Sequence, residues 1–287
     1  MKEVLLISNL DLHADYIMQY ASQFCAHYSC KLHIIHFEEG LSPTLVSSSI
    51  YYDKIGYSID TFERQVDLIT KIKKLTSQYL QTDWLNVSIR DENESIFLQE
   101  FLNDTLIDLI IVGQHVFKAD TNHLSQQFKH ILSNITTSPM LVIPSLEVFK
   151  PYHKCNYLLQ IMNEDNIQHI KQFCTLFKGS ELTLTHVEQS SKDKIAEWTE
   201  KKWMTYIHQN INQKINYESL QMKYNDYINR ENYAITHIFD LLVFSTSKRS
   251  LWQRIFAPST TLKVLTNLEM PALVFKNLPE SDSSKVS

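Results

Sequence analysis

The hydrophobic pattern of the chain contains two segments that predict strands buried on both faces of a sheet. Their apolar and β-branched residues are consecutive rather than alternating, and the segments lie at 107–113 and 239–245. Each is followed by a polar stretch, a helical pattern and a second apolar run that starts with a proline, at 139–143 and 271–275. The same succession of elements therefore occurs twice.

The spacing within this succession indicates an internal repeat. Asp108 precedes Pro139 by 31 residues, and Asp240 precedes Pro271 by the same 31 residues. Equal order and equal spacing in the two halves are typical of a duplication.

A second pair of similar segments lies upstream, at 32–38 and 182–188, with leucine, histidine and glutamate at matching positions. From His36 to Asp108 the first half is 18 residues longer than the second half from His186 to Asp240. We assign this excess to a loop from Gly40 to Asp60.

Strands alternate with helices in both halves, which predicts right-handed crossovers and an α/β fold: two tandem doubly wound domains, each with a five-stranded parallel sheet and helices on both faces. The expected strands are near 3–8, 32–38, 84–89, 108–113 and 140–144, then 155–161, 181–187, 215–221, 240–245 and 272–276. The expected helices are near 13–28, 60–81, 93–104 and 123–136, then 165–177, 192–212, 226–237 and 258–267. The expected domains are 1–146 and 152–278, and 279–287 is a polar, Ser-rich tail.

Composition and charge narrow the class of protein. The 287 residues are 44% hydrophobic and 21% charged, which is ordinary for a globular chain. A formal net charge of −5 argues against a general nucleic-acid or anionic-membrane binder. The first residues do not resemble a secretory signal, and no apolar run reaches the ~18 residues of a membrane span. Four cysteines without CxxC spacing predict free thiols, no metal site and a cytoplasmic protein.

The order of these motifs resembles a universal stress protein domain, twice in succession. The resemblance rests on the strand VLLI at 4–7, the helix that starts at Ala14, the strand KLHIIH at 31–36, and the DLIIVG and SPMLVIP segments that end the half. The second half repeats the last two as DLLVF and MPALV. The resemblance covers nearly the whole chain and implies a five-stranded parallel sheet and a stress-linked, often regulatory role.

One branch of that family binds ATP, which lets the site be tested residue by residue. The resemblance implies an aspartate after the first strand and a stretch Gly-x2-Gly-x9-Gly-Ser/Thr after the fourth, where glycines let backbone N–H groups approach phosphate closely. This chain has Asn9 in place of the aspartate, and in the second half Met162 or Asn163 aligns there. Only Gly113 of the first-half glycines is kept, and Gln126 and Gln127 stand where the last glycine and its Ser/Thr partner are expected.

The second half departs further from the pattern. Ser245 replaces the first glycine, and Pro258 and Ser259 replace the last two positions, in a chain with four glycines in total. Two features favour an anion nonetheless. Basic residues cluster where the phosphate loop is expected, at Lys248, Arg249 and Arg254. A helix start at 257–261 exposes the N–H groups of Ser259 and Thr260. The alternative is a solvated basic loop beside an ordinary helix cap.

These observations predict a tandem universal stress protein that binds partners or a small ligand, with degenerate ATP motifs, no catalytic residues and no cofactor. The histidines of the second strands, His36 and His186, are expected to be structural, since no metal-ligand spacing surrounds them. The alternative is an adenine-nucleotide-binding protein with weak hydrolysis, in which ATP or AMP binds near Asn9, Gly113, Gln126 and Gln127. The expected partners are the two domains themselves, as a pseudo-dimer through the strands at 139–143 and 271–275, a second copy in a homodimer, and an unidentified protein, but neither nucleic acid nor membrane.

Overall fold

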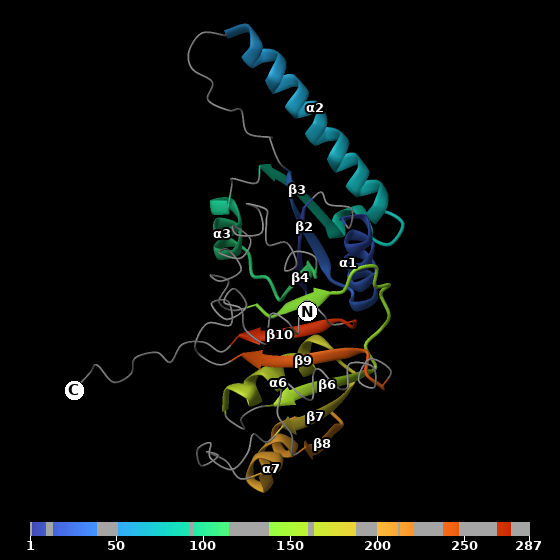
Figure 1. Cartoon of the computed structure of the whole chain (residues 1–287), viewed down its shortest axis with the longest axis vertical. Coiled ribbons are helices and arrows are strands. Elements are labelled where there is room, and N and C mark those ends of the chain that lie inside the picture. Colours follow the sequence, from blue (N-terminus) through green and yellow to red (C-terminus); the bar gives the residue numbers. More distant parts are fainter. Residues whose placement is uncertain are drawn as a thin grey trace, which may run out of the picture. The chain divides into compact units, whose positions relative to one another are not determined.

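The computed structural model describes most of the chain as alternating strands and helices (Figure 1). The described residues are 2–9, 14–38, 51–91, 95–114, 138–159, 164–187, 200–211, 213–220, 238–246 and 269–276. They divide into two compact units, 1–135 with 145–149, and 136–144 with 150–287. The helices expected near 123–136, 226–237 and 258–267 lie outside the described residues.

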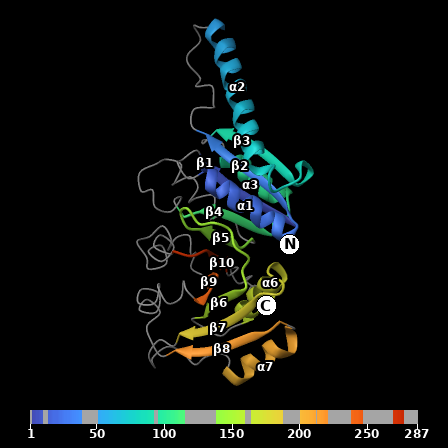
Figure 2. The ribbon, with the colours of Figure 1, turned by 90° about the vertical axis from the view of Figure 1, so that its right-hand side faces the viewer.

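Unit 1 contains four parallel strands in the order β3-β2-β1-β4. Its elements are β1 (Glu3–Asn9), α1 (Ala14–Tyr28), β2 (Lys31–Glu38), α2 (Tyr51–Thr76), a short 3-10 turn (Thr82–Trp84), β3 (Leu85–Asp91), α3 (Ser95–Asp104) and β4 (Leu109–Gly113). The first two crossovers run from β1 to β2 and from β2 to β3, and the third returns from β3 to β4 on the other side of β1. Right-handed connections then put α1 and α2 on one face and α3 on the other, as Figures 1 and 2 show.

Unit 2 repeats this order as β10-β9-β6-β7-β8, five parallel strands, with β5 added antiparallel to β10. Its elements are β5 (Met140–Ile143), β6 (Lys154–Leu159), α6 (Glu164–Leu176), β7 (Glu181–Val187), α7 (Glu200–Asn210), β8 (Ile215–Leu220), β9 (Leu241–Thr246) and β10 (Ala272–Lys276). The predicted mixed α/β fold with a mostly parallel sheet is confirmed. The fifth strand of the first half is β5, and its contacts assign it to unit 2.

Strands β4 and β5 are buried along their whole length. Every residue of β4 and of β5 is buried, as the consecutive apolar pattern predicts. On α7, Trp203 and Ile207 are fully buried four residues apart, so the aromatic positions of this helix face the core.

The prediction of a loop from Gly40 to Asp60 is wrong for residues 51–60. Residues 51–60 are the first turns of α2, which begins at Tyr51 rather than near residue 60. The remainder of the expected loop, 39–50, lies outside the described residues. The excess length of the first half therefore lengthens a helix, and Gly56 inside this segment does not interrupt it.

Candidate functional site

The strand order places the candidate site of unit 1 between β1 and β4. Crossovers leave β1 in one direction and return to β4 on its other side, and in open α/β sheets ligands bind at the carboxyl ends of the strands at such a switch point. Ile7 lies opposite Val112 in the parallel register, so Asn9 and Gly113 end neighbouring strands at the same edge. The side chain of Asn9 lies outside what the structure describes, and the next residue of the other strand, Gln114, is buried.

A buried histidine lies one strand away from this switch point. His36 on β2 is opposite Ser8 on β1, and its Nδ1 is 3.3 Å from the Ser8 hydroxyl oxygen. Burial, with the charge of Lys71 as a smaller cause, lowers the pKa of His36 from its ordinary 6.5 to about 4. The imidazole is therefore neutral at physiological pH, and its place in the core supports the structural role predicted from the sequence.

In unit 2 the equivalent edge is filled by a network of buried side chains. Asn166, in the first turn of α6, accepts a 2.6 Å hydrogen bond at Oδ1 from the Ser245 hydroxyl at the end of β9. The Tyr157 hydroxyl on β6 donates to the same oxygen at 3.4 Å and lies 3.5 Å from His169 Nδ1. The His169 ring stacks on Phe275 of β10 at a centroid distance of 5.0 Å. Groups from three strands and one helix thus converge on the carboxyl half of unit 2.

A second buried polar pair joins β6, β7 and β8 on the other face of the sheet, since side chains alternate along a strand. The Thr185 hydroxyl lies between Asn156 Oδ1, at 2.9 Å, and the carboxylate of Glu218. Asn156 and Thr185 are both fully buried. Because polar groups in a core must be satisfied, such contacts fix neighbouring strands and leave these groups paired within the protein.

The position of Ser245 explains how the second half differs from the first. Gly113 and Ser245 each follow the repeated aspartate by five residues; Gly113 is the last residue of β4, and Ser245 is the last but one of the equivalent strand β9. A glycine there leaves the backbone open to a ligand, whereas Ser245 sends a side chain toward α6 and bonds Asn166. Asn166, Tyr157 and His169 were not predicted from the sequence, since no motif spacing marks residues that meet only through the fold.

The remaining predicted site residues are Gln126, Gln127, Lys248, Arg249, Ser259 and Thr260, and they lie outside the described residues. Their proposed contact with an anion stays a prediction. Among the described residues there is no group of three or more His, Cys, Asp or Glu that could hold a metal ion. Of the described helices, none has the length and apolarity needed to cross a bilayer.

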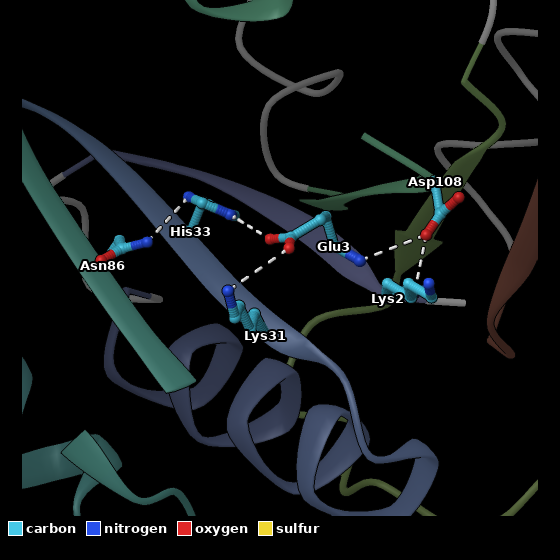
Figure 3. Close-up of polar contacts among 6 residues, drawn as sticks. All are labelled: Lys2, Glu3, Lys31, His33, Asn86 and Asp108. Carbon is cyan, nitrogen blue, oxygen red and sulfur yellow. Dashed lines mark hydrogen bonds and ion pairs between the residues drawn. The ribbon is translucent and has the colours of Figure 1, made fainter. Parts of the chain in front are cut away.

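At the opposite edge of each sheet, the two repeated aspartates make equivalent contacts. Asp108 Oδ2 accepts hydrogen bonds from the backbone N–H groups of Lys2 and Glu3, at 2.6 and 3.2 Å (Figure 3). Asp240 Oδ2 accepts them from His153 and Lys154, at 2.9 and 2.8 Å. The aspartates tie the start of the fourth strand of each half to the start of its first strand.

These contacts also correct the alignment of the two halves. The backbone N–H of Asp108 donates to the Glu3 carbonyl and that of Asp240 to the Lys154 carbonyl, so Glu3 and Lys154 are equivalent. Asn9 lies six residues after Glu3, and the residue six after Lys154 is Gln160. The second-half counterpart of Asn9 is therefore Gln160, rather than Met162 or Asn163 as the sequence comparison indicated.

Comparison with solved structures identifies this architecture. A universal stress protein from Archaeoglobus fulgidus DSM 4304 matches with a TM-score of 0.63 and 12% sequence identity, over 96% of this chain and 96% of that chain. The chain has the universal stress protein fold. The predicted resemblance is confirmed at the level of the fold.

A further structure with a comparable arrangement is the cytoplasmic domain of a prokaryotic cation chloride cotransporter. It matches with a TM-score of 0.51 and 9% identity, over 96% of this chain and 95% of that chain. No family model and no curated protein matches the sequence. At these identities the comparisons establish the universal stress protein fold and leave the chemistry of the site to its residues.

Proposed function

We propose that this chain is a tandem universal stress protein, which acts in the stress response by binding other molecules and not by catalysis. The observation that carries the proposal is the Ser245–Asn166–Tyr157 network, which fills the second-half edge where a ligand of this fold would lie. In the first half, Asn9 replaces the aspartate and Gly113 is the one glycine left after the fourth strand.

The tandem form is supported by the equivalent contacts of Asp108 and Asp240 and by the repeated strand order within each unit. The antiparallel pairing of β5 with β10 supports an intramolecular pseudo-dimer of the repeats. The buried thiols of Cys25, Cys30 and Cys155 fit a reducing compartment, and we assign the protein to the cytoplasm.

The groups described at the edge support a role without catalysis. The buried His36 has a lowered pKa of about 4, so it is a poor proton acceptor near neutral pH. The Ser245 hydroxyl is bonded to an amide oxygen, which is not a general base that could activate it. The Ser8 hydroxyl lies 3.3 Å from His36 Nδ1, but both side chains are buried in the core, away from any bound molecule's approach from solvent.

Calorimetric titration with ATP, ADP and AMP, up to millimolar concentration, tests the proposal. We expect no saturable heat and no phosphate release above that of buffer. Mass spectrometry of the purified protein under native conditions, which detects a co-purifying small molecule, is the second measurement. Saturable nucleotide binding, or a nucleotide carried through purification, would overturn this proposal in favour of an adenine-nucleotide-binding protein.

The second candidate is an adenine-nucleotide-binding protein, with weak ATP hydrolysis, that uses a phosphate site without the glycine pattern. The observation that favours it is Gly113, which keeps the first-half edge free of the side chain that Ser245 places in the second. In that case Gly113→Val lowers nucleotide affinity at least about tenfold by steric exclusion, while Ser245→Ala leaves it unchanged. The two variants therefore also locate any binding to one half.

A further inference from the structure

The long helix α2 has a feature that neither the fold nor the candidate site uses. It contains 26 residues and is about 39 Å long at 1.5 Å per residue. The C-terminal part packs on α1 and β3, whereas the N-terminal part extends past them (Figures 1 and 2). The extension comes from the segment that lengthens the first half relative to the second, so the duplicated fold itself does not require it.

Two different faces of α2 can be distinguished in the part where side chains are described. Ile72 and Thr76, four residues apart, are buried against the rest of unit 1, with exposed fractions of 2% and 0%. Phe62 and Val66, also four residues apart, are 66% and 44% exposed. The second face is therefore apolar and open to solvent, and it is separate from the face that holds α2 to its own unit.

The spacing of Phe62 and Val66 is part of a regular pattern in the sequence of α2. Apolar residues recur at alternating steps of three and four, at Tyr52, Ile55, Ile59, Phe62, Val66 and Ile69. Alternating steps of three and four average 3.5 residues, and this pattern, which spans 18 residues, fits the a/d seam of a left-handed coiled coil. A helix that only covers its own domain needs a stripe of period 3.6, whereas a 3.5 period matches a second helix lying alongside.

Charge along the helix identifies the second helix. Residues 51–63 carry three acids and one lysine, a net charge of −2: Asp53, Lys54, Asp60 and Glu63. Arg64 lies between the two parts, at the middle of the helix. Residues 65–76 carry one acid and three lysines, a net charge of +2: Asp67, Lys71, Lys73 and Lys74. A second α2 laid antiparallel places each −2 half opposite a +2 half, and a parallel one places like charges together.

We propose that the protein forms a homodimer in which α2 of one copy pairs antiparallel with α2 of a second copy along the seam of Phe62 and Val66. In this arrangement Val66 of one copy packs in the layer of Phe62 of the other. Lys73 and Lys74 are exposed on the helix, so the basic half can meet the acidic half of the partner helix. Burial of the seam removes the exposed Phe62 ring from water and orders the extended turns of α2.

Sedimentation velocity on the full chain, between about 1 and 100 micromolar, tests this interface. We expect a species of twice the 33.7 kDa of one chain at the upper concentration. Val66→Asp puts a charge into the seam of both copies and is expected to raise the dimer dissociation constant about 100-fold. The matched control is Leu106→Asp, the same kind of change at a residue that is 85% exposed outside α2, and it should leave the dimer unchanged.

Charge reversal tests the antiparallel direction. Asp60→Lys with Glu63→Lys, and separately Lys73→Glu with Lys74→Glu, make like charges face each other and should each weaken the dimer about tenfold. All four changes in one chain exchange the signs of the two halves and should restore the wild-type constant. A wild-type monomer throughout the range, a Val66→Asp variant that dimerises as the wild type does, or a fourfold variant that fails to recover while circular dichroism shows it folded, each overturns the proposal.

Discussion

Asp108 and Asp240 occupy equivalent positions and each accepts two backbone hydrogen bonds at Oδ2, from Lys2 and Glu3 in one half and from His153 and Lys154 in the other. The four contacts span 2.6 to 3.2 Å. In both halves the aspartate opens the fourth strand and holds the beginning of the first strand beside it. The residue that marks the repeat in the sequence is thus the one that sets strand register in the structure.

The first prediction concerns the strength of these contacts. Asp108→Ala and Asp240→Ala each remove a charged acceptor from two N–H groups at the partly exposed edge of the sheet. We expect each to lower the free energy of unfolding by about 1 to 2 kcal/mol, by urea denaturation. Asp104→Ala, a carboxylate exposed at the end of α3, is the control and should change stability by less than about 0.5 kcal/mol. Equal losses in all three variants would contradict the role of the pair.

The second prediction concerns pH. Burial lowers the pKa of His36 to about 4, whereas the unfolded chain has the ordinary value of 6.5. Between these values the unfolded chain binds the proton and the folded chain does not, so stability falls as the pH falls from 6.5 toward 4 and is unaffected above 6.5. The expected loss from this residue at pH 4 is about 3 kcal/mol.

His36→Gln removes this titration and isolates it from that of other groups. The difference in unfolding free energy between pH 7 and pH 4, measured in urea, should be smaller in the variant by about the same 3 kcal/mol. His153→Gln removes an exposed imidazole and leaves its backbone N–H on Asp240, so its pH dependence should match the wild type. A variant with unchanged pH dependence at position 36 would show that the folded protein protonates His36 normally.

The fold was accessible from the sequence where hydrophobic periodicity is strong. The consecutive apolar residues of β4 predict a fully buried strand. The equal distances from Asp108 to Pro139 and from Asp240 to Pro271 predict the repeat. The sequence does not indicate the beginning of α2, because Tyr51, Tyr52 and Gly56 are weak helix formers.

The candidate site was predicted less completely. The sequence shows which residues of the ATP site are missing, as in the replacement of the aspartate by Asn9, and it assigns Asn9 and Gly113 to one candidate site. The structure adds that these two residues end neighbouring strands. It could not reveal that Ser245 bonds Asn166, because 79 residues separate them and only the crossover of α6 brings them together. Long-range side-chain pairs of this kind carry no local signal.

The third prediction concerns the reactivity of the thiols. Cys174 is half-buried, and burial raises its pKa to about 11. Because the thiolate is the reactive form, Cys174 should react with a disulfide reagent at pH 8 roughly 100-fold more slowly than a free thiol. Its rate should increase about tenfold per pH unit up to pH 11. Burial also raises the pKa values of Cys25 and Cys155, which should react only in urea.

Cys174→Ser identifies the reacting group in this experiment. In the variant the labelling seen without urea should disappear, and three of the four thiols should still react after unfolding. Fast labelling of the wild type at neutral pH would contradict the half-buried position of this residue on α6.

The fourth prediction tests the Ser245–Asn166 contact that fills the edge of unit 2. Asn166→Ala removes an oxygen that accepts bonds from both Ser245 and Tyr157 and should lower the free energy of unfolding by about 2 to 3 kcal/mol. Ser245→Ala should cost about 1 kcal/mol. If the two side chains stabilise each other, the double variant loses less unfolding free energy than the two single variants together. The expected difference, the coupling energy, is about 1 kcal/mol.

The matched pair for this cycle is Ser245→Ala with Thr175→Ala, since Thr175 is on the exposed side of α6 and bonds the Lys171 carbonyl of its own helix. Its effect should add to that of Ser245→Ala within about 0.5 kcal/mol. If the stability losses of Ser245→Ala and Asn166→Ala also add, the Ser245 hydroxyl does not stabilise the fold through its hydrogen bond to the Asn166 amide. The second-half edge would then be held by Tyr157, His169 and Phe275 alone, and Ser245 would be free to meet a ligand.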